Sequence, residues 1–252
     1  MKIAYLSTFY PFRGGIAQFN AALYRYLSIG NEVKAYTFKR QYPDFLFPGT
    51  SQLVSGDDPA DKIDSIRTLD SINPLSYFNT TRKIRKFSPD FLLTKFWIPF
   101  FGPSLGFVTN QLKKKGTINI SILDNVIPHE KRIGDLKLVK YFLNRNHGFI
   151  VMSDAVKNDL LTLKPDAKYK YLVHPLYDHF GSKFDHTEAR KKLNIPQNKK
   201  VLLFFGFIRS YKGLDLLLET MKYLSDDYLL VIAGEVYGDF KEYSDYIKKE
   251  NL

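Results

Sequence analysis

The stretch GFIRSYKGLDLLLE, residues 206–219, joins an apolar run to a segment with helical spacing. The run before it, Val201–Phe205, predicts a buried strand, and Leu214–Leu224 predicts a helix. A glycine stands on either side of the connecting turn, so the backbone there can curve tightly. This order of strand, turn and helix is typical of an α/β fold with a parallel sheet.

The same turn holds two cations, Arg209 and Lys212, directly before Gly213. An Arg guanidinium makes forked hydrogen bonds to phosphate oxygens, and Lys adds a compact charge. Beside a helix N-terminus such a pair favours a diphosphate and stabilises the charge on a leaving diphosphate. A solvated basic turn is the simpler interpretation for one cation. Two cations between glycines favour a diphosphate-binding turn.

The alternation of strand and helix runs through the whole chain. The pattern predicts strands at Ile3–Ser7, Val33–Phe38, Asp90–Phe96, Ile118–Leu123, Phe149–Met152, Tyr171–His174, Val201–Phe205 and Tyr228–Ala233. It predicts helices at Ile16–Leu27, Tyr77–Phe87, Pro103–Lys115, Leu136–Asn146, after an N-cap at Ser153, and at Glu188–Leu193, Leu214–Leu224 and Phe240–Lys249. Residues 40–74 are rich in Pro, Gly, Asp and Ser, which predicts irregular structure.

The pattern breaks at HPLYDHFG, residues 174–181, where the charge balance also changes. Residues 1–180 hold 25 Lys and Arg against 15 Asp and Glu, whereas residues 181–252 hold 12 against 11. We therefore expect a complete Rossmann-like parallel-sheet domain at 1–178. Residues 179–252 would be a linker and the first part of a second such domain. That part is expected to be incomplete, because two strands leave unpaired edges.

The basic first domain predicts a polyanionic partner, either a phosphorylated substrate, an anionic membrane surface or a nucleic acid. The nucleic-acid interpretation depends on charge alone, since no nucleic-acid module accompanies it. Cysteine is absent from the sequence, which fits a reducing compartment. No export signal or long apolar run is visible. The expected location is the cytoplasm, with peripheral contact to the inner face of the membrane.

Two further loops follow predicted strands, where parallel sheets place their ligands. Gly14 and Gly15 favour either a phosphate contact at the next helix or an ordinary turn. The dinucleotide pattern G-x-G-x-x-G is missing here, which argues against NAD. In the loop DNVIPHE, residues 124–130, His129 and Glu130 are candidates for proton transfer or for binding sugar hydroxyls. Hydrogen bonding within the loop is the alternative. No His and carboxylate cluster predicts a metal site.

These motifs together resemble the retaining glycosyltransferases of family 4, which have the two-domain GT-B fold. The resemblance is carried by Phe205, Gly206, Lys212 and Gly213, by RGGIAQ at residues 13–18, by NVIPHE at 125–130, by Val151–Ser153 and by His174–Pro175. The chain departs from the family at Phe207, where many members have the Arg that here stands at Arg209. A carboxylate motif that holds the nucleotide ribose in the family has no counterpart within these residues.

The resemblance implies transfer of a hexose from a nucleotide diphosphate sugar to a saccharide or lipid-linked acceptor, with retention of configuration, as in polysaccharide biosynthesis. It implies no cofactor and no required metal. It assigns Arg209, Lys212 and Gly213 to the donor diphosphate, Gly14 and Gly15 to the cleft, and His129 to the sugar or acceptor, with Glu130 as its companion.

An alternative from a different functional class stays open at this stage. The chain could be a catalytically inactive remnant that serves as a binding or scaffold protein. A group of aromatic residues is interpreted as core rather than as an acceptor-lipid contact. Its members are Phe96, Trp97, Phe100 and Phe101.

Overall fold

The computed structural model describes residues 1–43, 47, 51–55, 60–128, 132–177, 181–236 and 238–252. The chain forms two compact units. The N-terminal unit comprises Met1–Leu46 and Ser51–Pro175, and the C-terminal unit comprises Phe47–Thr50 and Leu176–Leu252.

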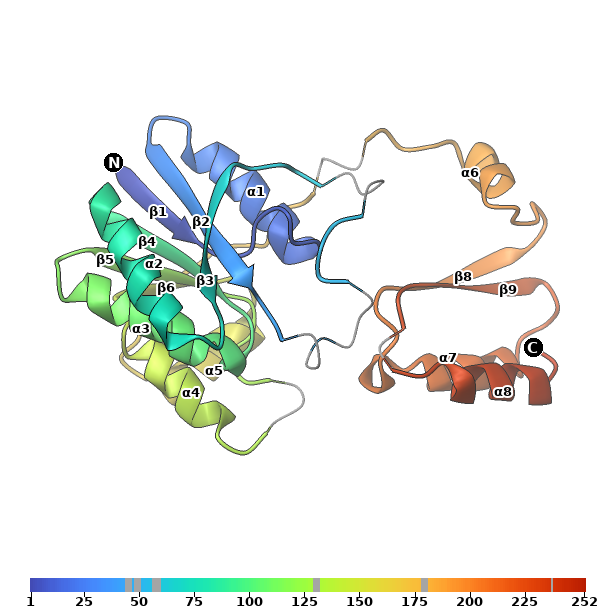
Figure 1. The fold of residues 1–252 in the computed structure, drawn as a ribbon. Coiled ribbons are helices and arrows are strands. Elements are labelled where there is room, and N and C mark those ends of the chain that lie inside the picture. Colours follow the sequence, from blue (N-terminus) through green and yellow to red (C-terminus); the bar gives the residue numbers. More distant parts are fainter. Residues whose placement is uncertain (44–46, 48–50, 56–59, 129–131, 178–180, 237) are drawn as a thin grey trace. The chain divides into compact units, whose positions relative to one another are not determined.

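The N-terminal unit is built on a seven-stranded parallel sheet with the order β3-β2-β1-β4-β5-β6-β7 (Figure 1). Its strands are β1 Lys2–Leu6, β2 Glu32–Arg40, β3 Ser65–Asp70, β4 Phe91–Phe96, β5 Ile118–Leu123, β6 Gly148–Val151 and β7 Tyr169–Tyr171. Its helices are α1 Gly15–Leu27, α2 Pro74–Phe87, the short 3-10 turn η2 Pro99–Phe101, α3 Gly102–Lys113, α4 Asp135–Leu143 and α5 Asp154–Leu163. The predicted α/β fold with a parallel sheet is confirmed.

The strand order reverses between β1 and β4, which pair in parallel from Ile3 opposite Phe91 to Leu6 opposite Thr94. Open α/β sheets bind their ligands at this reversal, outside the carboxyl ends of the strands. The loop from β1 to α1 and the end of β4 therefore form the part of this unit where a ligand is expected.

Helices cover both faces of the sheet, and successive residues of β4 show which helix lies on which face. The ring of Phe96 stacks on Phe142 of α4 with 4.4 Å between centroids. The preceding residue, Lys95, lies against Phe19 of α1. Because successive strand residues point to opposite faces, α4 and α1 pack on opposite sides. Figure 1 shows α2, α3 and α4 side by side on the α4 face.

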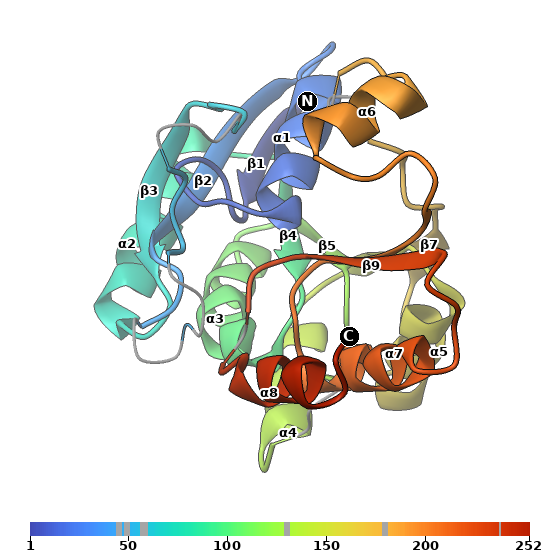
Figure 2. The same ribbon diagram turned by 90° about the vertical axis from the view of Figure 1, so that its right-hand side faces the viewer.

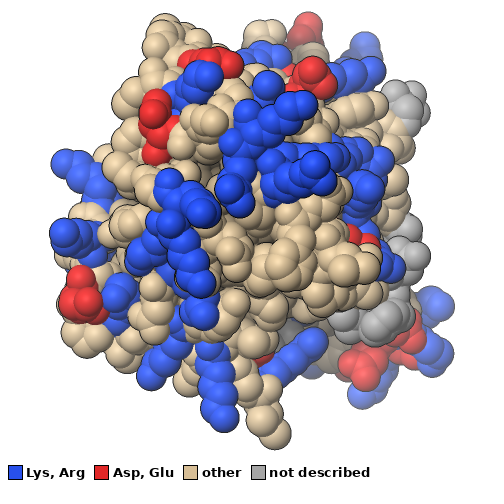
Figure 3. Space-filling model, turned by 60° about the vertical axis from the view of Figure 1, so that its left-hand side comes forward, with Lys and Arg blue, Asp and Glu red and all other residues tan. Residues whose placement is uncertain are grey.

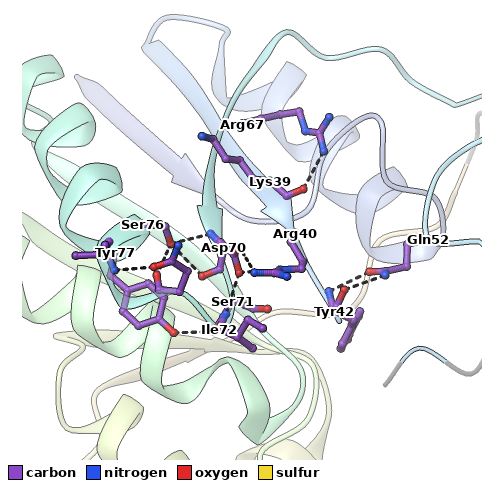
Figure 4. A network of polar contacts seen from close by, with 12 residues as sticks. Lys39, Arg40, Tyr42, Gln52, Arg67, Asp70, Ser71, Ile72, Ser76 and Tyr77 are labelled. Carbon is purple, nitrogen blue, oxygen red and sulfur yellow. Dashed lines mark hydrogen bonds and ion pairs between the residues drawn. The ribbon is translucent and has the colours of Figure 1, made fainter. Parts of the chain in front are cut away.

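The prediction of irregular structure for residues 40–74 was wrong at β3, which is a regular strand beside β2. Only Thr68 and Leu69 of this strand are buried, so its own pattern is weak. The strand is held by tertiary contacts instead: Arg40 makes a forked pair with Asp70, at 3.0 and 2.6 Å (Figure 4). The backbone N–H of Asp70 also donates to Ser76 Oγ, at 2.9 Å. The prediction for the last strand of the N-terminal unit was also wrong in its bounds, because β7 lies at Tyr169–Tyr171 rather than Tyr171–His174.

The aromatic cluster after β4 belongs to the core. Phe96, Trp97 and Phe101 are buried, and Phe100 packs against them as a partly buried residue. The indole N–H of Trp97 donates to Tyr42 Oη at 2.9 Å. The backbone of Tyr42 exchanges two hydrogen bonds with the Gln52 amide, both 3.0 Å (Figure 4). The core interpretation of these aromatics is thereby confirmed, and the cluster fixes the segment after β2.

The C-terminal unit has one pair of parallel strands, β8 Lys200–Phe205 and β9 Tyr228–Ala233. Its helices are α6 His186–Lys192, the 3-10 turn η3 Ser210–Lys212, α7 Leu214–Met221 and α8 Lys241–Lys249. Figures 1 and 2 show α7 and α8 side by side along one face of the strand pair. The buried residues on that face are Ile208, Leu214 and Leu218. The predicted strands and helices of this region are confirmed, with small changes at their ends.

None of the helices formed by the described residues combines the length and the apolar character needed to cross a membrane.

Candidate functional site

The loop between β1 and α1 places Gly14 and Gly15 at the first turn of a helix. Gly14 has φ 100° and ψ 171°, a conformation that side chains with a Cβ rarely adopt, so glycine is required there. A Cβ built at either glycine meets no atom within 4 Å. The backbone of this loop is therefore open to an approaching group, as the phosphate hypothesis requires.

A small pocket lies beside the same loop. Its lining residues are Tyr10, Phe12, Arg13, Gly14, Ala17, Gln18, Ala60 and Asp61. Asp61 forms an ion pair with Arg25, and Arg13 Nε donates to the Ser51 carbonyl at 2.7 Å. The pocket thus combines a helix N-terminus with side chains of both charges, all within the N-terminal unit.

Asn20 of α1 fastens the helix to the end of β1. Its Oδ1 accepts from the Tyr5 hydroxyl at 2.5 Å, and its Nδ2 donates to Ser7 Oγ and to the Thr8 carbonyl, both 2.8 Å. Asn20 and Tyr5 are both fully buried. Because buried polar groups are costly unless they are hydrogen-bonded, these bonds specify one position for α1 against the sheet.

A buried ion pair lies at the carboxyl ends of β4 and β5, and the sequence did not predict it as a site. Lys95 Nζ lies 2.6 Å from Asp124 Oδ1, and 3.6 Å from the centroid of the Phe19 ring. The Lys95 side chain is 1% exposed and that of Asp124 is 20% exposed. The sequence did contain a signal for this pair, because a lysine stands within the mostly apolar stretch from Phe91 to Trp97. A single lysine in a predicted strand is common, however, and does not by itself indicate a site.

Burial changes the pKa of both partners. Burial lowers the pKa of Lys95, and the neighbouring Asp124 carboxylate opposes that change. Burial also raises the pKa of Asp124, while Lys95 and, more weakly, His174 hold it down. The pKa of Tyr5 is raised by burial and further by Asp124. Each charge of the pair therefore opposes the effect of burial on the pKa of its partner, although burial is the larger effect for both.

The loop after Asp124 is described as far as Pro128. The Val126 side chain is buried, and the backbone N–H of Ile127 donates to Asp159 Oδ2 at 3.4 Å. His129 and Glu130 lie outside the described residues, so their assignment stays a prediction.

The predicted diphosphate turn in the C-terminal unit begins and ends with glycines in left-handed conformations. Gly206 has φ 113° and Gly213 has φ 74°. The Gly206 N–H donates to the Ala233 carbonyl at 3.0 Å, and the Ile208 N–H donates to that of Glu235 at 2.9 Å. Ile208 is 3% exposed. The turn is thus anchored by its buried Ile208 and by backbone bonds to the residues around the end of β9.

The two cations of the turn lie around one aromatic ring. Arg209 Cζ and Lys212 Nζ are each 5.5 Å from the centroid of the Tyr211 ring. The 3-10 turn η3 brings them together, because the Lys212 N–H donates to the Arg209 carbonyl at 2.9 Å. Gly213 then precedes the first residue of α7, and no side chain caps the N-terminus of this helix. Both cations therefore lie next to a helix N-terminus, as the diphosphate hypothesis requires.

Among the described residues, no group of three or more His, Asp or Glu side chains is arranged to hold a metal ion.

Comparison with known proteins gives one family match and several matches in fold. Residues 185–252 match the family described as Glycosyl transferases group 1. That match covers the diphosphate turn and the whole C-terminal strand pair. A comparison with curated protein sequences finds no match.

Three solved structures illustrate the likeness in fold. Anabaena Alr3699/HepE in complex with UDP-glucose has 14% identity and a TM-score of 0.70, over 100% of this chain and 66% of that one. UDP-GlcNAc 2-epimerase from Methanocaldococcus jannaschii has 12% identity and a TM-score of 0.59, over 100% of this chain and 69% of that one. An alpha-glucosyltransferase in complex with UDP and a DNA 13-mer has 11% identity and a TM-score of 0.51, over 100% and 60%.

The chain spans about two thirds of the length of the Anabaena protein, with 67%, 65% and 66% of it covered in three structures. At these identities the likeness concerns the fold. This chain therefore has a GT-B-like fold of Rossmann-like α/β units, and its residues 185–252 match the group 1 glycosyl transferases.

Proposed function

We propose that the protein is a glycosyltransferase that moves a hexose from a nucleotide diphosphate sugar to a saccharide or lipid-linked acceptor, with retention of configuration. The N-terminal unit takes the acceptor and the C-terminal unit takes the donor. We further propose that it acts in the cytoplasm, at the surface of an anionic membrane, in the synthesis of a polysaccharide.

One observation carries this proposal: the turn from Gly206 to Gly213 holds Arg209 and Lys212 around one ring beside a helix N-terminus. Two cations beside a helix N-terminus suit the charge that develops on a leaving diphosphate. The family match covers this turn, and the Anabaena structures hold UDP and UDP-glucose. These findings support a nucleotide sugar as the donor.

In this proposal, the bond between the anomeric carbon and the diphosphate oxygen breaks, an acceptor hydroxyl forms a bond to that carbon, and its proton passes to the departing diphosphate. Retention requires attack from the face that the diphosphate leaves. Gly14 and Gly15 are proposed to lie at the cleft, and His129, with Glu130 beside it, to contact the sugar or acceptor.

Turnover with a panel of nucleotide sugars tests the proposal. We expect release of nucleoside diphosphate from at least one of UDP-glucose, UDP-GlcNAc and GDP-mannose, and an increase in that rate when a saccharide acceptor is added. The anomeric configuration of the product, read by NMR, reports retention. Binding of a donor without turnover of any panel member would contradict catalysis and favour the non-catalytic binding protein.

The proposed membrane contact has a physical basis in the N-terminal unit. From Ile72 to Thr117 the sequence holds eight Lys and Arg and one acidic residue, Asp90. Figure 3 brings forward the side of the molecule that lies on the left in Figure 1 and shows bands of Lys and Arg there. On α2, Leu75 and Phe78 are 77% and 60% exposed. We define the basic surface by the exposed cations of α2 and of the turn after α3. They are Arg82, Lys83, Arg85, Lys86, Lys114 and Lys115.

Vesicle binding checks this contact. Each basic residue near an anionic surface contributes about 1 kcal/mol, so replacing Arg82, Lys83 and Lys86 with Ala is expected to weaken binding to phosphatidylglycerol vesicles roughly a hundredfold. The matched control removes three cations from α8, by Lys241→Ala, Lys248→Ala and Lys249→Ala, and should bind like the original protein. Equal co-sedimentation with neutral and anionic vesicles would contradict the membrane contact.

A further inference from the structure

The buried pair of Lys95 and Asp124 is difficult to explain by stability alone. Removing an ammonium and a carboxylate from water costs several kcal/mol per ion after relaxation, and apolar residues of similar volume often do as well or better. Apart from Thr94, the other residues of β4 are apolar, and a Met or Leu in place of Lys95 would suit a buried strand. A charge at this position therefore points to a role other than packing.

The two charges are not equally hidden. Lys95 is 1% exposed, whereas the Asp124 side chain is 20% exposed. Among the described residues, the Lys95 ammonium contacts Asp124 and the Phe19 ring and has no other hydrogen-bond acceptor. The lysine is thus a buried support, and the carboxylate is the member of the pair that a ligand can reach.

The pair also lies where this fold places its ligands. Lys95 is near the carboxyl end of β4, beside the reversal of strand order at β1, and Asp124 directly follows β5. The Asp124 N–H donates to the Phe96 carbonyl at 2.9 Å, which fixes the carboxylate at the sheet edge. The Phe19 ring lies near both Lys95 and His174: its centroid is 3.6 Å from the Lys95 ammonium and 5.4 Å from the centroid of the imidazole.

We propose that Asp124, held in place by Lys95, binds hydroxyl groups of the saccharide acceptor at the carboxyl edge of the N-terminal sheet. Lys95 acts as a positioning residue. The inference rests on the proposed function for the class of ligand, and it adds a binding residue that the predicted site residues do not include.

The chemistry favours a polyhydroxylated ligand over an anion. An ionised carboxylate only accepts hydrogen bonds, and sugar hydroxyls donate them, whereas a phosphate at Asp124 would meet a like charge. A hydrogen bond to a charged group contributes about 1.5–3 kcal/mol, which corresponds to roughly a ten- to a hundredfold change in affinity.

D-Glucose serves as the soluble probe, with binding read by saturation-transfer NMR, which requires no turnover. Asp124→Asn is expected to weaken the glucose interaction at least roughly tenfold. The double variant Lys95→Met with Asp124→Asn removes both charges, so that no unpaired charge stays buried, and should bind glucose as weakly as Asp124→Asn does. The control Asp154→Asn changes an exposed Asp that pairs with Lys157 at 2.6 Å in the same unit, and should bind glucose as the original protein does.

A pH series separates positioning from a merely structural role. Lys95 and His174 lower the Asp124 pKa, and the nearby Tyr5 hydroxyl is held neutral by burial. Since the ionised carboxylate is the binding form, Lys95→Met should raise the Asp124 pKa and move the acid limit of glucose binding to higher pH. Three results would overturn the proposal: glucose binding of the original strength in the double variant, loss of binding in Asp154→Asn, or no glucose signal from the original protein. Absence of turnover with every nucleotide sugar would instead count against the proposed function and leave a glucose signal standing.

Discussion

Replacing Arg209 and Lys212 together with Ala is expected to lower kcat/KM for the nucleotide sugar donor roughly a thousandfold. Both side chains lie around the Tyr211 ring at the start of α7, so both can face one diphosphate. Removing a single fixed donor to a developing oxyanion typically costs two to three orders of magnitude, and residues that share one ligand do not add independently. The KM for the donor should rise and kcat should fall, because the turn contacts the diphosphate both before its bond breaks and while it breaks.

The measurement combines steady-state kinetics with titration calorimetry of UDP. The control Lys191→Ala with Lys248→Ala removes the same charge from α6 and α8 of the same unit, and separates the turn from a general charge effect. UDP affinity that is the same in the original protein and in the Arg209 and Lys212 variant would remove the donor site from this turn.

The second large effect is expected for Gly234→Ala, which should destabilise the C-terminal unit by about 3 kcal/mol or more. A Cβ built at Gly234 lies 1.8 Å from the Gly206 carbonyl oxygen and 2.7 Å from its carbon. Both atoms are backbone, so no side-chain rotation relieves the overlap. The strand ends must separate, and Gly206 is also the residue that begins the diphosphate turn.

Thermal unfolding followed by circular dichroism measures this effect, and UDP titration reports its consequence for the turn. Gly148→Ala in β6 is the control, because its nearest contact would be the Lys168 carbonyl oxygen at an ordinary 3.5 Å. A Gly234→Ala protein with an unchanged unfolding temperature would show that β8 and β9 are not held as close together as the structure has them.

Local patterns were sufficient to predict most of the fold. The bounds of β5 and β9 match the predicted ranges Ile118–Leu123 and Tyr228–Ala233. In β5 apolar residues alternate with Asn119 and Ser121, β9 is an apolar run, and turn residues follow both strands. β3 was missed because it is held by the pairing of Arg40 with Asp70 and by its alignment with β2, rather than by its own hydrophobicity. Tertiary contacts of this kind leave no periodic signal in one sequence.

The candidate sites of the two units differed in the same way. The turn with Arg209 and Lys212 could be predicted because its residues are neighbours in the sequence. The pair of Lys95 and Asp124 joins two strands, and each residue alone resembles an ordinary strand or loop position. Their proximity depends on the pairing of β4 with β5, which only the folded chain reveals.

The hydrogen bonds of Asn20 have a consequence for how a ligand meets the first loop. Because its amide fixes α1 to the end of β1 through the Tyr5, Ser7 and Thr8 atoms, the loop that carries Gly14 and Gly15 is held at both ends before anything binds. A partner that docks there meets a backbone already in shape, so little conformational freedom is lost on association. The strength of that association is then set by the contacts themselves rather than by ordering of the loop.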